Sequence, residues 1–456
     1  MIASAIFKRF MKETPVPVMA RALIERVFNP ETLDKWFEET AENQYTKDLL
    51  FSSVFDMMSL VVSRVHPSIN STYQSLKEEI SVSIKSVYNK LNGLESTTSA
   101  ELVRYSAIES RALIKELGGG IENPLPGYRL KILDGNCLEA SDHRIKELRE
   151  LTAGALPGKS LVVLDPVLRI IIDVYPCENG HAQERSLLGK VLESVQANDV
   201  WTGDRNFCTV GFLCGIKNKK GFFIIREHGN LPYDIIEPKM KYIGKSDTGK
   251  VYEQLIEVVD DQGEKHTFRR IIVKLLKETR DGEKEIYILS NLRTKEVSAM
   301  QIAELYRERW KIETVFQELT RDFNSEINGL GYPKAALFGF CVTLVIYNLL
   351  SIMKSAMQNV HGVEVVEKQI SGYYIANEIS GTHIGMGVAI PEKEWKSFRN
   401  MSNTQMAQFL IELAGMMKLY KYKKHPRGPK KKVLKKKSDK NVPHVSTAKI
   451  LAKRNT

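Results

Sequence analysis

The order of elements expected before the middle of the chain constrains the fold most. Alternating apolar residues predict a strand over 128–138. Two β-branched runs at 160–166 and 168–176 predict a strand pair joined by a turn. An amphipathic helix is expected over 181–195, and a strand returns over 198–204. Three strands, a helix and a fourth strand predict an α/β fold built on one central sheet.

Acidic residues stand at the ends of the first and the fourth of these strands. Asp134 follows the apolar run LKIL, and Asp204 follows VWTG. Carboxylates are hard oxygen ligands of the kind that Mg²⁺ prefers. A third acid on a later helix would complete the usual ligand set of a two-metal phosphoryl-transfer site.

The segment 306–320, YRERWKIETVFQELT, supplies a candidate for that third acid. Its apolar residues recur with helical spacing and include Trp310, which is expected on the packed face. Tyr306, Arg309 and Glu313 are separated by three and then four residues, so they fall on one face of a helix. An ordinary amphipathic helix with a solvated Arg–Glu pair would show the same pattern.

Acids on the first and fourth strands of this order predict a ribonuclease H-like core. The stretch between Asp204 and Glu313 is too long for a single connection. Short strand-like runs separated by Gly, Asp and Lys turns fill it, which predicts a β-rich insertion over 216–295. The catalytic core is then expected over 126–215 and 296–360. Within it, the apolar segment 335–353 is interpreted as a buried helix, and no membrane partner is expected.

The N-terminal region, residues 1–125, is predicted to be a helical DNA-binding region. Residues 67–92 contain two short helical patterns around a turn, which is helix-turn-helix length. The second helix is expected to present Lys85 and Lys90 outward as DNA contacts. Short helical hairpins also occur in proteins that bind no DNA.

The charge is concentrated at the C-terminal end. Residues 421–456 hold 14 of the 66 Lys and Arg but one of the 55 Asp and Glu, which leaves a net charge of −2 on the rest. We expect a disordered basic tail there, drawn to polyanions or serving solubility alone. Residues 361–420 are expected to be mostly helical.

The five cysteines show no metal-ligand spacing, so neither a structural zinc nor a disulfide framework is expected. The N-terminus lacks a long apolar core and a clear cleavage site, so no signal peptide is expected. Both observations favour a reducing cytoplasm.

Three blocks of this sequence resemble a known family. The spacing of Tyr306, Arg309 and Glu313 is similar to the Tyr-x₂-Arg-x₃-Glu-x₆-Lys signature of DDE transposases from bacterial insertion sequences, in the insertion-sequence-four family. LDGNCLE around Asp134 and TGDRNF around Asp204 resemble the two aspartate blocks of that family. The resemblance covers roughly residues 128–353.

The chain departs from the signature at its final position. Thr320 stands where the family has a lysine thought to contact DNA, and Arg321 or Lys311 would have to substitute for it.

The resemblance implies cut-and-paste transposition at the terminal inverted repeats of double-stranded DNA. Asp134, Asp204 and Glu313 would be catalytic and would hold two Mg²⁺ ions, with Mn²⁺ as a possible substitute. Hydrolysis would free a 3′-OH, which would then attack target DNA, with or without a hairpin intermediate. A homodimer is expected because two ends must be joined, and the site of action would be the bacterial cytoplasm at the nucleoid.

The resemblance also implies roles for neighbouring residues. Arg309 would neutralise phosphate charge, and Tyr306 would bind DNA near the cut. Arg205 and Asn206 would orient Asp204, contact phosphate or serve a purely structural role.

Two alternatives remain open at this point. One is a ribonuclease H-like nuclease without strand transfer. The other is a transposase-derived DNA-binding protein without catalytic activity, which Thr320 keeps open.

Overall fold

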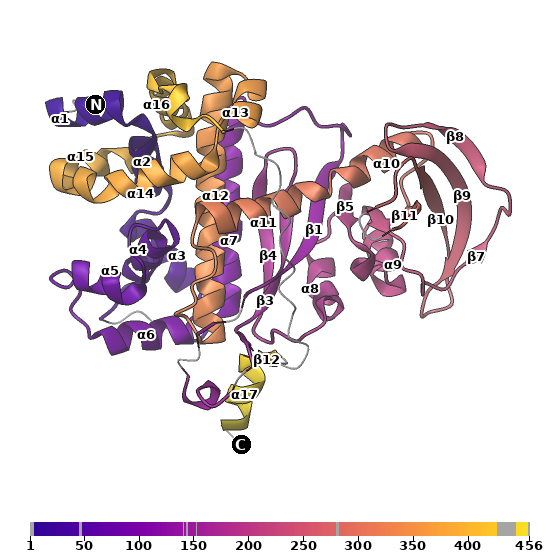
Figure 1. Ribbon diagram of the computed structural model, residues 1–456, viewed down its shortest axis with the longest axis horizontal. Helices are drawn as coiled ribbons and strands as arrows, with labels where there is room; N and C mark the ends of the chain where they lie inside the picture. Colours follow the sequence, from indigo (N-terminus) through magenta and orange to yellow (C-terminus); the bar gives the residue numbers. More distant parts are fainter. Residues whose placement is uncertain are drawn as a thin grey trace.

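The computed structural model describes residues 4–44, 48–139, 141–142, 145–151, 153–279, 282–425 and 444–454. It is a mixed α/β fold in which a large sheet lies beside a thick layer of helices (Figure 1). The ten-stranded sheet has the order β4-β3-β1-β5-β6-β11-β10-β9-β7, and β8 pairs with β9.

The first half of this sheet contains the four strands predicted for the core and one strand from the predicted insertion, β6. They are β1 (Arg129–Cys137), β3 (Lys159–Asp165), β4 (Ile170–Cys177), β5 (Asp199–Gly203) and β6 (Phe222–Arg226). β5 lies parallel to both β1 and β6, whereas β3 runs antiparallel to both β1 and β4. The helix predicted over 181–195 is shorter, with a 3₁₀ turn η2 (Glu184–Leu187) followed by α8 (Leu188–Glu193).

The register between β1 and β5 determines where the two aspartates lie. Leu133 is the parallel partner of Gly203, so the next residues, Asp134 and Asp204, leave the paired segment side by side. Asp134 is inside β1 rather than at its end, because β1 continues to Cys137 against β3.

The region predicted as an insertion extends the same sheet. Its strands are β7 (Asp234–Ile235), β8 (Lys241–Lys245), β9 (Gly249–Val259), β10 (Lys265–Leu275) and β11 (Glu285–Ser290). β11 pairs antiparallel with β6, which joins the two halves without a break. The expected start of the insertion at 216 is too early, because β6 pairs in parallel with β5 and continues the strands that carry the aspartates.

Helices cover both faces of the sheet. On one face α9 (Val210–Asn218) packs with α8 over a core that includes Trp201 and Phe223. The opposite face of the first strands packs on α7 (Ser96–Glu116) and α12 (Pro333–His361), which stand side by side in Figure 1. Other helices of the helical layer are α1 (Ala5–Glu13), α2 (Pro15–Val27), α3 (Pro30–Thr40), α4 (Phe51–Val62), α13 (Val363–Gln369), α14 (Gly372–Ala389), α15 (Glu392–Trp395) and α16 (Asn403–Met416).

α12 is apolar and long enough to cross a membrane. However, 94% of its most apolar 18-residue window is buried inside the fold. Its few polar residues have partners there: Asn348 accepts a hydrogen bond from the backbone N–H of Ile171 at 2.7 Å and donates to the carbonyl of Ile171 at 2.8 Å. The prediction of a buried helix over 335–353 is therefore confirmed.

The helix-turn-helix candidate consists of α5 (Ile69–Ser75) and α6 (Ile84–Gly93), with Ser83 as the N-cap of α6. Lys85 is exposed, as expected. Lys90 does not point outward as predicted: its ammonium lies 4.7 Å from the centre of the Phe37 ring on α3, and partial burial lowers its pKa. The packing of α6 against α3 accounts for this difference.

The C-terminal end is partly ordered. The 3₁₀ turn η5 (Leu419–Tyr422) packs against α14, and β12 (Val445–Ser446) pairs in parallel with β2 (Ala155–Leu156). Helix α17 (Thr447–Arg454) follows, and its apolar residues pack on Ile145 and Leu148. The prediction of disorder over 421–456 is wrong for these two ends; residues 426–443 and 455–456 lie outside the described residues.

Candidate active site

Two consecutive helices carry the third acid across the sheet. α10 (Ala299–Arg307) and α11 (Trp310–Asp322) run from the inserted strands past β1 towards the helical layer (Figure 1). The sequence predicted one helix over 306–320, but the backbone tightens at Glu308 and Arg309. The N–H groups of Arg309 and Ile312 bond the carbonyls three residues back, as in a 3₁₀ turn.

Arg309 lies at this junction and joins two of the predicted acids. Its Nη1 donates to Asp134 Oδ2 at 3.1 Å, and its Nη2 donates to Glu313 Oε1 at 2.9 Å. The residue is only 7% exposed, and its Nε has no partner within the described part of the chain. A buried guanidinium therefore fixes Asp134 and Glu313 relative to each other.

Burial and like charge act together on Asp134. The pKa of Asp134 is raised to about 6, mainly by burial. Arg309 and the Gly135 N–H lower it, and the nearby carboxylates of Asp204 and Glu313 raise it. These effects place all three acids within electrostatic reach of one another. A single guanidinium cannot neutralise three carboxylates, so the cluster favours binding of additional positive charge.

Asp204 follows β5 and caps a 3₁₀ turn. Its Oδ1 accepts a hydrogen bond from the Asn206 N–H at 3.0 Å, so the backbone of Asn206 orients this carboxylate. The side chain of Arg205 is exposed and faces Glu283 of the inserted region at 3.6 Å. Arg205 and Asn206 thus lie beside the acid cluster, and Arg205 extends away from it.

The aromatic residue predicted to contact DNA is buried. Tyr306 is 6% exposed and belongs to the core beneath α10, and burial raises its pKa. Trp310 shows the opposite deviation: it was expected on the packed face but is 59% exposed, with Arg309 lying 5.1 Å from its ring centre. The change of turn at Arg309 rotates Trp310 out of the apolar stripe, so helical periodicity could not reveal it.

The candidates for the missing signature lysine are already paired. Arg321 forms two hydrogen bonds with the buried Asp322, the longer at 2.7 Å, and Lys311 pairs with Glu308. Thr320 is exposed and donates to the Phe316 carbonyl at 3.1 Å. Lys85 and Lys90 lie on α6, in a different part of the fold from the acids (Figure 1).

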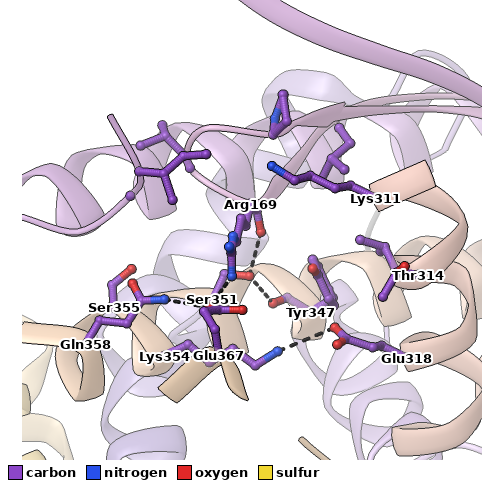
Figure 2. Close-up of a pocket in the computed structure, with 16 residues that line it drawn as sticks. Arg169, Lys311, Thr314, Glu318, Tyr347, Ser351, Lys354, Ser355, Gln358 and Glu367 are labelled. Carbon is purple, nitrogen blue, oxygen red and sulfur yellow. Dashed lines mark hydrogen bonds and ion pairs between the residues drawn. The ribbon is translucent and has the colours of Figure 1, made fainter. Parts of the chain in front are cut away.

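The other side of α11 lines a cavity of about 180 Å³. Figure 2 shows Lys311, Thr314 and Glu318 facing residues of α12 across it. Lys354 pairs with Glu318 at 3.4 Å, and Arg169 pairs with Glu367. Since none of the three predicted acids lines it, this cavity is separate from the acid cluster.

A second group of ligand-type side chains joins α9 to the β9–β10 hairpin. Cys214, Asp260 and His266 have ligand atoms within 4.8 Å of one another. The ammonium of Lys217 lies 3.1 Å from His266 Nδ1, which must therefore accept, and His266 Nε2–H then donates to Asp260 at 2.9 Å. With both ring nitrogens engaged, the group acts as a hydrogen-bond chain between the core and the hairpin.

Comparison with known proteins finds a family match over the segment that contains the acid cluster. Residues 128–349 match the family model described as "Transposase DDE domain". The protein named "Putative transposase y4zB" of Sinorhizobium fredii is 25% identical over 150 residues, which are 32% of this chain and 39% of that protein. The chain thus spans well under half the length of this relative.

A cryo-EM structure of the piggyBac transposase synaptic complex with hairpin DNA aligns over 86% of both chains, with 11% identity and a TM-score of 0.38. At that TM-score much of the arrangement differs, so the assignment rests on the family match. The matched segment begins at β1 and continues into α12, and it includes Asp134, Asp204 and Glu313. Over residues 128–349, just under half of its length, this chain is similar to the transposase DDE domain family.

Proposed function

We propose that this protein is a DNA transposase that moves an insertion sequence by a cut-and-paste route. The observation that carries the proposal is the convergence of Asp134, Asp204 and Glu313 around Arg309 within the segment that matches the transposase domain. The proposed substrates are double-stranded transposon ends and target DNA.

The donor set fits a pair of hard divalent cations. Three carboxylates share one buried guanidinium, and the pKa of Asp134 is raised to about 6 in this environment. Asp134, Asp204 and Glu313 would hold two Mg²⁺ ions, which when bound would activate the attacking hydroxyl and stabilise charge on the leaving oxygen. Mn²⁺ has the same ligand preference and is the natural substitute.

The residues of the chain itself have separate tasks in this proposal. Arg309 fixes two of the acids, and its positive charge would offset the charge of a phosphate bound beside them. Trp310 offers an exposed aromatic face beside the cluster, suited to stacking on a base next to the cut. Tyr306 packs in the core next to the junction between α10 and α11. The backbone N–H of Asn206 orients Asp204 by donating to its carboxylate.

The wider layout follows from the same proposal. Strand order β4-β3-β1-β5-β6 with a helix bringing the third acid fits a ribonuclease H-like core, extended by the inserted strands. Lys85 on the helical N-terminal region is exposed and is a candidate contact for the transposon end. Joining two ends calls for a homodimer, and a protein that acts on bacterial DNA would work at the nucleoid.

The test is a cleavage and joining assay on a duplex that carries the element's own end. Wild type with Mg²⁺ should nick the DNA, leave a 3′-OH and join that end to a second duplex. Glu313→Gln should lose both steps by at least about a thousandfold, yet bind the end as tightly as wild type in Ca²⁺. Glu318→Gln, one helical face away, is the matched control and should cleave normally.

Each other outcome has a definite meaning. Nicking without joining would favour a nuclease that lacks strand transfer. End binding by wild type without any nicking would favour a DNA-binding protein derived from a transposase. Substantial cleavage by Glu313→Gln would refute the assignment of the metal ligands.

A further inference from the structure

The backbone of Arg64 adopts a conformation that side chains rarely take. Arg64 follows α4 with φ of 59°, in the left-handed region that favours glycine. The bond from the Val65 N–H to the Leu60 carbonyl closes the end of the helix around it at 2.9 Å. Such a position usually carries glycine or asparagine, and an arginine is unusual there.

The guanidinium of Arg64 reaches the C-terminal end of α11. Nη1 donates to the Arg321 carbonyl at 3.0 Å, and Nη2 donates to the carbonyls of Thr320 at 3.0 Å and Phe323 at 2.7 Å. The last carbonyls of a helix have no partner within the helix, and a cation there also interacts favourably with the helix dipole. One side chain thus caps the helix that carries Glu313.

Further contacts tie this cap to the helical layer. The Asn324 N–H donates to the Val62 carbonyl at 2.8 Å, directly beside the cap. Ser380 on α14 donates from its hydroxyl to the Arg64 carbonyl, also at 2.8 Å. The end of α11 is therefore connected to α4 and α14, while its first turn contacts the acid cluster through Arg309.

We propose that Arg64 is a positioning residue for catalysis. By capping the C-terminal end of α11, it holds Glu313 two turns away in line with Asp134 and couples the helical layer to the active site. The cap lies at Thr320, where the family signature has its lysine, so this chain fixes that part of the helix from a different element. The inference rests on the proposed transposase function.

Three variants separate the effect of the Arg64 side chain from the effect of its backbone conformation. Arg64→Gly removes the guanidinium and relieves the positive φ. Arg64→Lys keeps a cation with three donors. Lys220→Gly is the matched control, because Lys220 is an exposed basic residue with φ of 60° after α9, away from α11.

The expected result is a loss of rate without a loss of folding. Arg64→Gly should melt at or above the wild-type temperature, bind the transposon end in Ca²⁺ as wild type does, and cleave about tenfold more slowly at saturating Mg²⁺. Hydrogen exchange at the amides of the last turn of α11 should speed up. Arg64→Lys should recover part of the cleavage rate and part of the protection from exchange. Lys220→Gly should change neither the cleavage rate nor the exchange in α11.

Two results would overturn the proposal: wild-type cleavage by Arg64→Gly, or unchanged exchange in the last turn of α11. If wild type itself cleaves nothing, the proposed function fails separately. In that case the readout becomes the affinity of the acid cluster for Mn²⁺, measured for wild type and Arg64→Gly, instead of the cleavage rate. An equal affinity would then reject a positioning role.

Discussion

At the scale of single residues, the candidate site is organised by buried charge. Three carboxylates meet a buried arginine that can bridge two of them. The planar guanidinium fixes the directions of these two hydrogen bonds, whereas the ammonium of a lysine would leave them less constrained. Without a bound cation, burial in this cluster keeps the pKa of Asp134 raised.

The first prediction concerns the pH dependence of stability in EDTA. With a pKa of about 6, folded Asp134 binds its proton more tightly than the unfolded chain, where Asp titrates near 3.9. The free energy of unfolding should therefore fall as the pH rises from about 4 to about 6. Asp134→Asn should be more stable than wild type by about 1–3 kcal/mol above pH 6 and equal to it near pH 4.

Urea unfolding at several pH values measures this difference. The exposed Asp261→Asn is the control and should show no such trend. A less stable Asp134→Asn at pH 7.5 would mean that the ion pair with Arg309 outweighs burial. Added Mg²⁺ should stabilise wild type but not Asp134→Asn.

At the scale of elements, the edge of the sheet and the long apolar helix depend on each other. β4 is the outermost strand on one side, and an edge strand leaves backbone groups without partners. Asn348 of α12 satisfies both the N–H and the carbonyl of Ile171, and it also donates to Ser106 of α7 at 2.9 Å. One amide thus connects β4, α7 and α12.

The second prediction follows from this connection. Asn348→Ala leaves the N–H and the carbonyl of Ile171 buried without a partner, so the free energy of unfolding should fall by about 2–4 kcal/mol. The exposed Asn230→Ala should change it by less than about 0.5 kcal/mol. Urea denaturation of both variants measures these changes. A fall of less than about 1 kcal/mol in the free energy of unfolding of Asn348→Ala would show that water can reach this edge.

At the scale of the whole molecule, most of the net positive charge lies outside the segment that holds the three acids. The body of the protein is nearly neutral, while the C-terminal residues carry the excess of Lys and Arg. The described ends of that segment are attached to the fold, at η5 on one side and at β12 and α17 on the other.

The third prediction tests this charge without disturbing the attached ends. Replacing the six lysines at 430–432 and 435–437 by glutamine should weaken binding to DNA of any sequence and flatten the plot of log affinity against log salt. The slope should decrease by up to about 5, because each phosphate contact contributes about 0.9. The same positions changed to arginine should keep the wild-type slope. An unchanged slope in the glutamine variant would favour a role in solubility alone.

Periodicity and charge in the sequence determined much of this protein. Alternating apolar residues predicted β1, whereas short apolar runs predicted β3, β4 and β5, because β3 and β5 are buried along almost their whole length. Acids after apolar runs identified Asp134 and Asp204, and helical spacing identified Arg309 and Glu313. These are local properties of neighbouring residues, so they can be recognised from the sequence alone.

Only the tertiary structure decided how these residues act together. The bridge from Arg309 to Asp134, the packing of Lys90 on Phe37 and the cap that Arg64 places on α11 all join segments far apart in the chain. Such contacts depend on which elements pack against one another. No periodicity within one segment encodes them, because their energy arises only when distant side chains leave water together.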